Sequence, residues 1–415
     1  MIWLIGNKGM LGSDVEIALK SASLEYISSD IDVDICDISQ LRSFPEGKDI
    51  SWIINCSAYT AVDQAEDEQD KAFAVNAEGA GNIAQMAKEI GARLIHISTD
   101  YVFDGNAEDG YSEEDPTSPQ GVYGASKLQG EVNIAQACSD YFILRIAWLY
   151  GRYGKNFVYT MLRLFRERDE VRVVSDQHGS PTWSRNVAQA ILAIVTANSK
   201  DYGIYHYTNE GRISWYNFAL KIYELGRKYG IFEKETSILP ICTDEYPTRA
   251  KRPANSYLFK SKIKKTFSVD LPEWDTSLDS FIVDVAGITR RTVRWEQYSE
   301  YDFSTANDLF DKGKYIYSLF FCQQSVEKLL KSIIEFRKLP PRIHNIRRLL
   351  DIAELYGYNE YIELVHTLDL YYIETRYAED LEVMKRDVTK EATKNILSET
   401  ECFLEWIKTK KKFFL

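Results

Sequence analysis

Cysteine and histidine are scarce in this 415-residue sequence, and neither is grouped. The six cysteines include no Cys-x-x-Cys pair and stand at no metal-ligand spacing, and the five histidines do not cluster with them. This scatter argues against a zinc site. We therefore expect no bound metal, and we expect the cysteines to be buried free thiols.

Long apolar runs and a signal peptide are also lacking. No apolar stretch approaches the roughly 20 residues needed to span a bilayer. The first residues, MIWLIGNKGMLG, have neither the basic flank nor the cleavage site of a signal peptide. We expect a mature cytoplasmic protein with no membrane partner.

An excess of basic residues is absent from both parts of the chain. Residues 1–286 carry 29 basic and 41 acidic residues, residues 287–415 carry 21 of each, and the formal net charge is −12. Nucleic-acid binders need a basic surface, so nucleic acid is disfavoured as a partner. The length favours two domains.

Short β-rich runs alternate with helical stretches over roughly the first 230 residues. The strand candidates are MIWLI, LEYIS, WIINC, RLIHIS, YFILRI and VRVV, and the helical candidates are 71–90, 123–138 and 184–198. This alternation predicts an α/β fold with a Rossmann-like, doubly wound parallel sheet. Residues 230–282 are less regular and richer in proline, which suits a small C-terminal substrate lobe over the carboxyl edge of the sheet.

The strand pattern ends near residue 302. YIYSLFFCQQSVEKLLKSII then carries apolar residues at alternating spacings of four and three, typical of a helix with one buried stripe. These residues are Tyr315, Leu319, Cys322, Val326, Leu329 and Ile333. With further helices expected at 345–356, 359–375 and 389–411, the sequence predicts an all-α helical bundle over 287–415, after an α/β domain over 1–286.

Three glycines, Gly6, Gly9 and Gly12, directly follow the first strand. Glycine lets the backbone turn tightly and approach a pyrophosphate, and the helix that follows offers its N-terminal N–H groups to the anion. An ordinary strand-to-helix turn is the alternative. Asp30 follows the second strand near the distance at which an acid binds the adenosine ribose, which would favour NADH over NADPH, unless it is an ordinary loop acid. Asp37 and Ile38 are alternative neighbours of the adenine.

A tyrosine and a lysine lie one helical turn apart in GVYGASK, where Tyr123 and Lys127 share a face. The strand RLIHIST ends at Thr99, and its carboxyl end and the next helix converge on the crevice where a nicotinamide would lie. Hydride delivery to a ketone requires a proton donor and a second hydrogen bond at the carbonyl oxygen. We expect Tyr123 to donate the proton with its pKa lowered by Lys127, Thr99 to fix the carbonyl, and Lys127 to hold the ribose. A solvated Tyr–Lys pair is the alternative.

Taken together, these residues resemble the extended short-chain dehydrogenase/reductases, and among them the reductases of sugar nucleotides. The resemblance runs through most of residues 1–282, in segments that include INCSAYTAVDQAE, VNAEGAGNIA, HISTDYVFDG, VYGASKLQGE, VVSDQHGSPT and YPTRAKRPANSYL. It implies NADH- or NADPH-dependent reduction of the C4 ketone of dTDP-4-dehydro-6-deoxy-L-mannose to dTDP-L-rhamnose. For the whole chain we expect a homo-oligomer. A non-catalytic regulatory subunit of the same fold is the alternative.

The resemblance also implies site residues. The catalytic residues would be Thr99, Tyr123 and Lys127. With the residues named above, the expected cofactor-binding set is Gly6, Gly9, Met10, Leu11, Gly12, Asp30, Asp37, Ile38, Ala58, Tyr59, Thr60, Asn76, Tyr123 and Lys127. The expected substrate-binding residues are Tyr101 and Trp148 beside the sugar, and Arg252 and Asn255 at the diphosphate or its sugar, with Gln177 and Thr182 shaping the pocket loop. Alternatives are a helix-surface amide for Asn76, a core role for Trp148 and a ligand-free surface position for Arg252.

The C-terminal part resembles the HEPN domain over about 302–411. ANDLFDKGKYIYSLFFCQQSVEKLLKSII, LPPRIHNIRRLL and TRYAEDL carry this resemblance, which implies self-association or nucleotide binding. A toxin or nucleotide-sensing system fused to a reductase is a further hypothesis. Arg337 and His344 have the spacing of the ribonuclease pair of some HEPN proteins, but an inter-helix loop separates them. We therefore expect His344 to cap or pack the following helix.

Overall fold

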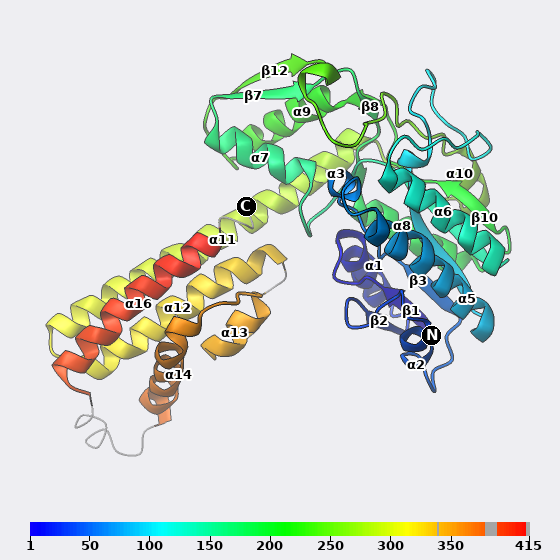
Figure 1. The fold of residues 1–415 in the computed structure, drawn as a ribbon. Coiled ribbons are helices and arrows are strands. Elements are labelled where there is room, and N and C mark those ends of the chain that lie inside the picture. The colour runs from blue at the N-terminus through cyan, green and yellow to red at the C-terminus, as the bar shows by residue number, and fades with distance from the viewer. Residues whose placement is uncertain (338–339, 378–387, 412–415) are drawn as a thin grey trace. The chain divides into compact units, whose positions relative to one another are not determined.

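A six-stranded, all-parallel sheet organises the N-terminal part of the computed structural model (Figure 1), which describes residues 1–337, 340–377 and 388–411. The strand order is β10-β5-β4-β3-β1-β2. The strands are β1 (Ile2–Ile5), β2 (Tyr26–Ser29), β3 (Trp52–Asn55), β4 (Arg93–Thr99), β5 (Tyr141–Ile146) and β10 (Gly203–His206). The order reverses direction between β1 and β3, the place where ligands bind in such sheets. The predicted fold class is confirmed.

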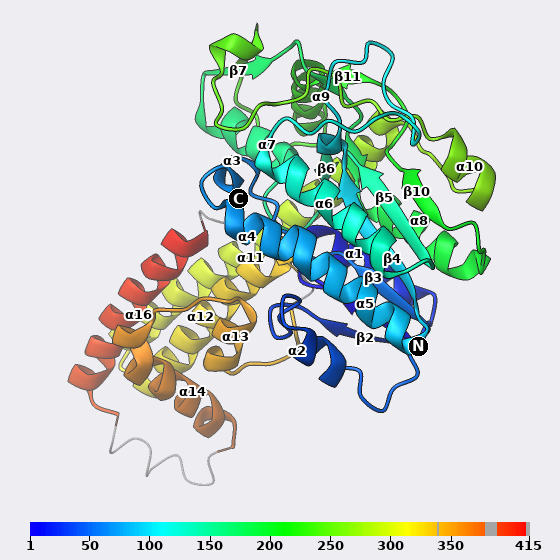
Figure 2. The ribbon, with the colours of Figure 1, turned by 45° about the vertical axis from the view of Figure 1, so that its right-hand side comes forward.

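Helices cover both faces of the sheet because its strands are apolar on both sides. In β1, Ile2 and Leu4 enter the core shared with helices α1 and α8, whereas Trp3 and Ile5 enter the core shared with α2 and α5. Figure 2 shows α5 and α6 side by side along one face. The bounds are α1 (Met10–Ser21), α2 (Ile38–Ser43), α5 (Ala80–Ile90), α6 (Val122–Ala137) and α8 (Ser184–Ala197).

Two details of the α/β part differ from expectation. VRVV does form a strand, β7 (Glu170–Val174), but β7 pairs with β12 (Ser237–Ile241) in a separate two-stranded sheet. The sixth strand of the central sheet is β10, which pairs with β5. The helix expected over 71–90 is α4 (Gln69–Phe73) and α5, joined by a π-helical segment, Ala74–Gly79.

Further helices and short strands complete this part of the chain. Two further strand pairs are formed by β6 with β9 and by β8 with β11. The remaining bounds are α3 (Val62–Ala65), η2 (Asp100–Val102), β6 (Leu149–Tyr150), α7 (Phe157–Glu167), β8 (His178–Gly179), β9 (Thr182–Trp183), β11 (Ile213–Ser214), α9 (Trp215–Lys228), η3 (Thr243–Glu245) and α10 (Ser261–Phe267).

The C-terminal part is helical, as predicted. The chain divides into two units, Met1–Ile282 and Val283–Leu415, and one helix, α11, runs through the boundary. The bounds are α11 (Trp274–Asp311), α12 (Tyr315–Arg337), α13 (Ile346–Ile352), η4 (Asn359–Tyr361), α14 (Ile362–Tyr377) and α16 (Lys390–Lys411). The predicted stripe of α12 is buried from Leu319 to Ile333, and Tyr315 is half-buried.

The cysteines are less buried than expected. Cys138 and Cys322 are buried, but Cys36, Cys242 and Cys402 are exposed. Cys36 and Cys242 lie in loops after β2 and β12, and Cys402 occupies an exposed position of α16, so the expectation of burial was wrong for these three.

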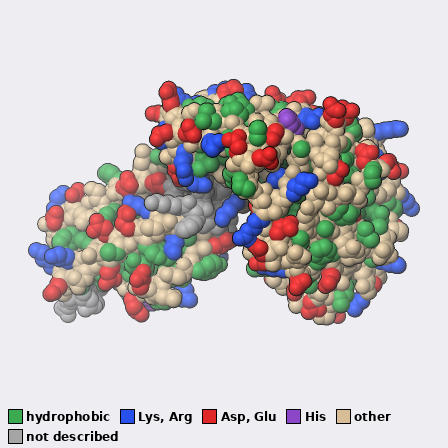
Figure 3. Space-filling view, turned by 45° about the horizontal axis from the view of Figure 1, so that its top comes forward, with side chains coloured by type: hydrophobic (Ala, Val, Ile, Leu, Met, Phe, Trp, Pro, Cys, Tyr) green, Lys and Arg blue, Asp and Glu red, His purple; other side chains and the backbone are tan. Residues whose placement is uncertain are grey.

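On the face drawn in Figure 3, Lys and Arg side chains are interspersed with Asp and Glu. Within the described ranges, no helix is both long and apolar enough to cross a membrane.

Candidate active site at the carboxyl edge of the sheet

The glycine turn between β1 and α1 is folded tightly against the end of β3. Gly6 has φ +80°, a conformation that favours glycine, and a Cβ added there would lie 2.7 Å from the Ser57 nitrogen. A Cβ on Gly12 would lie 2.0 Å from the Gly6 carbonyl oxygen, and Gly9 is the N-cap of α1. The absence of side chains therefore lets the turn and the N-terminus of α1 close on one another.

Asp30, which directly follows β2, forms a hydrogen bond with this turn. Its carboxylate accepts hydrogen bonds from the backbone N–H of Lys8 at 3.0 Å and of Ile31 at 2.9 Å. Asp37 is the N-cap of α2, where it accepts from the Ser39 N–H at 2.9 Å, and Ile38 packs against the adjoining core. The structure thus places Asp30 at the turn itself and gives Asp37 a capping role.

Asn76 holds the segment that follows β3. Its Oδ1 accepts from the Tyr59 N–H at 2.8 Å, and its Nδ2 donates to the Tyr59 carbonyl and to the Ser126 hydroxyl, both at 3.0 Å. The side chain is 1% exposed, so the alternative of a helix-surface amide was wrong. Asn76 fixes Ala58, Tyr59 and Thr60 beside α6.

Thr99, Tyr101 and Tyr123 meet where β4 ends and α6 begins. The Thr99 hydroxyl accepts from the Tyr101 N–H at 3.2 Å and hydrogen-bonds with Tyr123. The rings of Tyr101 and Tyr123 pack edge to face with centroids 5.4 Å apart. Gly124 permits this approach, because a Cβ there would lie 2.2 Å from the Tyr101 carbonyl oxygen.

The Lys127 side-chain nitrogen contacts residues of β4. Its side chain is 1% exposed, and its Nζ donates to the Ile97 carbonyl at 2.6 Å and lies 3.2 Å from His96 Nε2. Burial lowers the pKa of Lys127 to about 8. Burial also raises the pKa of Tyr123, against the opposing effect of its hydrogen bond with Thr99. The expected lowering of the tyrosine pKa by Lys127 was therefore wrong, because desolvation of the phenol is the largest influence on its pKa.

Asp100 is a residue of this site that the sequence analysis did not assign. It is 5% exposed, accepts from the Thr99 hydroxyl at 3.0 Å, and has its pKa raised to about 6, chiefly by burial. An acid directly after a strand-end threonine is the signal that could have indicated it.

Trp148 forms an aromatic stack. It adopts φ +48° and stacks on Trp215 with ring centroids 3.5 Å apart and planes 7° from parallel. Gly179 leaves room for the indole, since a Cβ there would lie 2.5 Å from it. Trp215, the first residue of α9, was not predicted as a site residue. Its aromatic character is the one sequence signal that could have indicated it.

Arg252 lies beside Tyr101. Its Nη2 pairs with Asp63 Oδ2 at 2.6 Å, and its Nη1 lies 3.5 Å from the Tyr101 hydroxyl. Asn255 is 5% exposed and binds backbone, with Nδ2 donating to the Ala107 carbonyl at 2.6 Å. Arg252 therefore borders the Tyr101 group, whereas Asn255 holds loops together.

Gln177 and Thr182 are buried in the loops around β8 and β9. Gln177 Nε2 donates to the Thr243 hydroxyl at 3.1 Å, and the Thr182 hydroxyl donates to the Ser180 carbonyl at 2.9 Å. Both side chains therefore bond to other loop residues.

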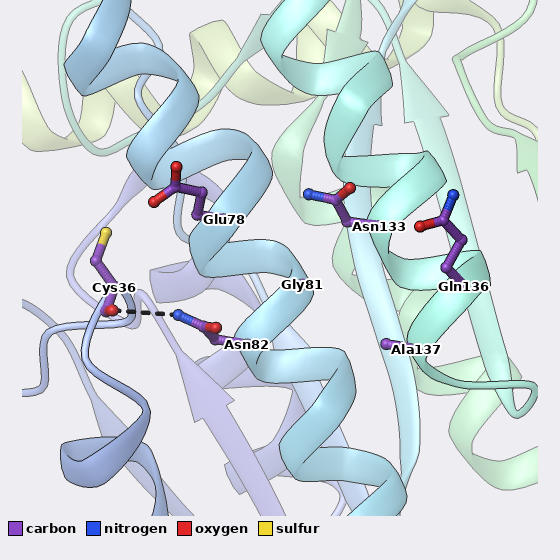
Figure 4. Close-up of a pocket in the computed structure, with 7 residues that line it drawn as sticks. All are labelled: Cys36, Glu78, Gly81, Asn82, Asn133, Gln136 and Ala137. Carbon is purple, nitrogen blue, oxygen red and sulfur yellow. Dashed lines mark hydrogen bonds between the residues drawn. The ribbon is translucent and has the colours of Figure 1, made fainter.

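A surface hollow of about 500 Å³ lies elsewhere, on the outer side of α5 and α6 (Figure 4). Asn82 on its wall donates to the Cys36 carbonyl at 3.2 Å. The lining residues are Cys36, Glu78, Gly81, Asn82, Asn133, Gln136 and Ala137, and no predicted site residue is among them. None of the residues expected to bind a nicotinamide or to donate a proton lines it, so the carboxyl edge of the sheet remains the candidate site.

In the helical part, His344 packs and does not cap. Its Nδ1 lies 3.1 Å from both Glu327 carboxylate oxygens, and its ring stacks on Tyr372 at 4.9 Å. The cap of α13 is Asn345, whose Oδ1 accepts from the Arg348 N–H at 2.8 Å. The Arg337 side chain lies outside the described residues.

Comparison with known proteins accounts for both parts of the chain. The RmlD substrate binding domain family matches residues 1–286, and the HEPN domain family matches residues 292–411. The chain is 38% identical to dTDP-4-dehydrorhamnose reductase of Aggregatibacter actinomycetemcomitans over 281 residues, covering 66% of this chain and 96% of the relative. It is 39% identical to the Escherichia coli K12 enzyme of the same name over 289 residues, covering 67% and 95%.

Solved structures agree with this relationship. A dTDP-4-dehydrorhamnose reductase of Clostridium acetobutylicum superposes with a TM-score of 0.65 at 39% identity, covering 68% of this chain and 99% of that one. The Bacillus anthracis enzyme in complex with NADP gives a TM-score of 0.64 at 37% identity, covering 68% and 98%. The chain therefore belongs to the RmlD substrate binding domain family, and a HEPN domain follows that region.

Proposed function

We propose that this chain reduces the C4 ketone of dTDP-4-dehydro-6-deoxy-L-mannose to dTDP-L-rhamnose with NADH or NADPH. Family membership supports the reaction class. The observation that carries the proposal is the meeting of Thr99, Tyr101 and Tyr123 at the carboxyl end of β4, in the same sheet edge as the glycine turn. In this proposal residues 1–286 are the reductase domain and residues 287–415 the HEPN-like bundle.

The glycine turn suits a dinucleotide. Side chains at Gly6 or Gly12 would collide with backbone, so the turn keeps its peptide groups accessible to a pyrophosphate at the start of α1. The proposed contacts are Gly6, Gly9, Met10, Leu11 and Gly12 at the turn, Asp30, Asp37 and Ile38 near the adenosine, and Ala58, Tyr59, Thr60 and Asn76 beyond β3. When bound, the nicotinamide supplies the hydride that the ketone carbon accepts.

The residues at the end of β4 would handle the proton. The Tyr123 phenol transfers its proton to the C4 oxygen as the hydride reaches C4, so the ketone becomes an alcohol and the tyrosine is reprotonated from water. The raised pKa of Tyr123 keeps the phenol protonated at neutral pH, which suits a proton donor. Thr99 hydrogen-bonds the same oxygen, and Lys127 holds the nicotinamide ribose.

The substrate side is built from aromatic and basic groups. Tyr101 and Trp148 would border the deoxysugar, because aromatic faces pack well against apolar sugar faces. Arg252 would bind the diphosphate, because a guanidinium forms paired hydrogen bonds with phosphate oxygens. Asn255 would lie beside the sugar nucleotide. Because Asp63 already neutralises Arg252, phosphate must compete with that carboxylate.

The choice between the two cofactors depends on Asp30. A carboxylate at the turn repels a 2'-phosphate, yet Asp30 is also occupied by the Lys8 and Ile31 N–H groups. We propose a preference for NADH, which initial rates with each cofactor would test.

For the helical part we propose self-association into a homo-oligomer, with nucleotide binding as the alternative. Light scattering of the full-length chain tests self-association.

The reaction itself is tested by absorbance at 340 nm. Full-length protein, the dTDP-4-keto sugar and either reduced cofactor should give loss of absorbance and a product with the mass of dTDP-rhamnose. No oxidation of either cofactor would favour the non-catalytic regulatory alternative.

A further inference from the structure

A buried chain of polar groups runs beneath the sheet edge from Lys127 to the glycine turn. Lys127 Nζ lies 3.2 Å from His96 Nε2, and His96 Nδ1 lies 3.0 Å from Asn55 Nδ2. Asn55 Oδ1 in turn accepts from the Ser57 N–H at 3.0 Å and the Ser57 hydroxyl at 2.6 Å. Asn55, His96 and Lys127 are each 1% exposed.

The Ser57 N–H determines which group donates in each hydrogen bond of this series of side chains. A backbone N–H can only donate, so the Asn55 oxygen must face Ser57 and the Asn55 NH₂ must face His96. His96 Nδ1 is therefore an acceptor. A neutral imidazole that accepts at Nδ1 carries its proton on Nε2, and burial together with the Lys127 charge holds the pKa of His96 well below its usual range.

This assignment has a consequence for Lys127. The Nε2–H of His96 points at Nζ, and an ammonium has no lone pair to accept it. A neutral amine can accept from His96 and still donate to the Ile97 carbonyl at 2.6 Å. We propose that His96 is a positioning residue that donates its Nε2–H to the neutral amine of Lys127. The position of the Lys127 side chain then depends on whether the Lys127 amine is protonated.

The surroundings of Lys127 fit such coupling. The Glu131 carboxylate and the Cys56 thiol are the titratable groups near Lys127 besides His96, and both favour its charged form. Burial acts against them and brings the pKa of Lys127 to about 8. Below that pH, Lys127 takes a proton from water and loses its hydrogen bond with His96, which frees it to turn toward Tyr123, one turn away on the same helix face.

The inference deepens the proposed function, because the charged Lys127 is the form we propose to hold the ribose. Its first test does not depend on turnover. Full-length protein labelled with ¹⁵N-histidine is titrated by NMR from pH 6 to 10, and the His96 signals are identified by their loss in His96→Gln. We expect Nδ1 unprotonated and Nε2 protonated throughout, with the Nε2 shift titrating near the pKa of Lys127.

Two comparisons complete this test. In Lys127→Met the titration of the His96 Nε2 shift should disappear while the tautomer is kept, and the buried His206 should not titrate in this range in either protein. An Nδ1-protonated or charged His96, or an Nε2 shift in the wild type that does not change with pH, would overturn the proposal.

The second test uses turnover. His96→Leu removes the donor, so the charged Lys127 persists to higher pH and the alkaline limb of the pH–rate profile should move up by about one unit. His96→Gln places an amide N–H near the lost Nε2–H and should restore most of the wild-type profile. Identical profiles for His96→Leu and the wild type would contradict the proposal, whereas absent turnover in the wild type would reject the proposed function and leave the NMR result standing.

Discussion

The Thr99 hydroxyl donates its hydrogen to the carboxylate of Asp100, with 3.0 Å between the oxygens. In this arrangement the single Thr99 hydroxyl hydrogen is already used by Asp100. Thr99 can donate to substrate only when it leaves Asp100, or when Asp100 is protonated and no longer requires the hydrogen bond. The ionisation of Asp100 therefore matters both to the site and to stability.

Asp100→Asn should stabilise the protein at alkaline pH and not at acid pH. Burial raises the pKa of Asp100 from the ordinary 3.8 to about 6, so its ionisation disfavours the folded state above pH 6. The shift corresponds to about 3 kcal/mol, fully present above pH 6 and lost as the pH falls toward 4. Urea unfolding of both proteins at pH 8 and pH 4.5 measures the difference, and an equal difference at both pH values would contradict the raised pKa.

Tyr123→Phe should lower kcat by about 10²–10⁴-fold, because it removes the proposed proton donor. The binding of NADH, measured by fluorescence, should change little. Tyr202→Phe is the matched control, since its hydroxyl also hydrogen-bonds, to Asp140 at 3.0 Å, but at the opposite end of the sheet. Near-normal turnover by Tyr123→Phe would remove this residue from the mechanism.

Trp215→Leu should raise the KM for the sugar nucleotide about 2- to 13-fold, the range of an aromatic pair worth about 0.5–1.5 kcal/mol. The reason is that Trp148 would lose the ring on which it stacks at 3.5 Å, whereas the proton donor would be untouched. Initial rates over a range of substrate concentrations separate KM from kcat. Trp406→Leu in the helical bundle serves as the control, and an unchanged KM in Trp215→Leu would show that the stack does not position substrate.

Arg145→Met should destabilise the protein by about 3–5 kcal/mol, because it leaves the Glu131 carboxylate buried without its cation. The Arg145 and Glu131 side chains are each 3% exposed, and the guanidinium donates hydrogen bonds of 2.6 and 3.0 Å to the carboxylate. Adding Glu131→Leu should recover part of the loss. The exposed pair Arg163–Glu167 is the comparison, where Arg163→Met should cost less than about 1 kcal/mol, and equal losses at the two sites would contradict the effect of burial.

Much of the fold could be predicted because it depends on local pattern. The runs that became β1 and β3–β5 are apolar on successive residues, which is typical of strands covered on both faces. GIYH was missed because β10 is a short edge strand of four residues whose partner, β5, lies about 60 residues earlier. VRVV was recognised as a strand, but nothing local indicates that its partner is β12 and not the central sheet.

The candidate site was predictable in composition and less so in orientation. Tyr123 and Thr99 could be paired from the sequence because the carboxyl end of a strand and the next helix meet at a known edge. The direction of Lys127 could not, since it depends on the Ile97 carbonyl and on a histidine whose tautomer is set by Asn55 and Ser57. Desolvation of Tyr123 is likewise a property of the packed site and not of its spacing to Lys127.

The most direct test of the central claim follows the hydride and the proton together. With reduced nicotinamide cofactor in which both C4 hydrogens are deuterium, the wild-type chain should form dTDP-rhamnose carrying deuterium at C4 of the sugar, detected by NMR and mass spectrometry, and Tyr123→Phe should form almost none. Unlabelled product, deuterium at another carbon, or equal labelling by the two proteins would contradict the account.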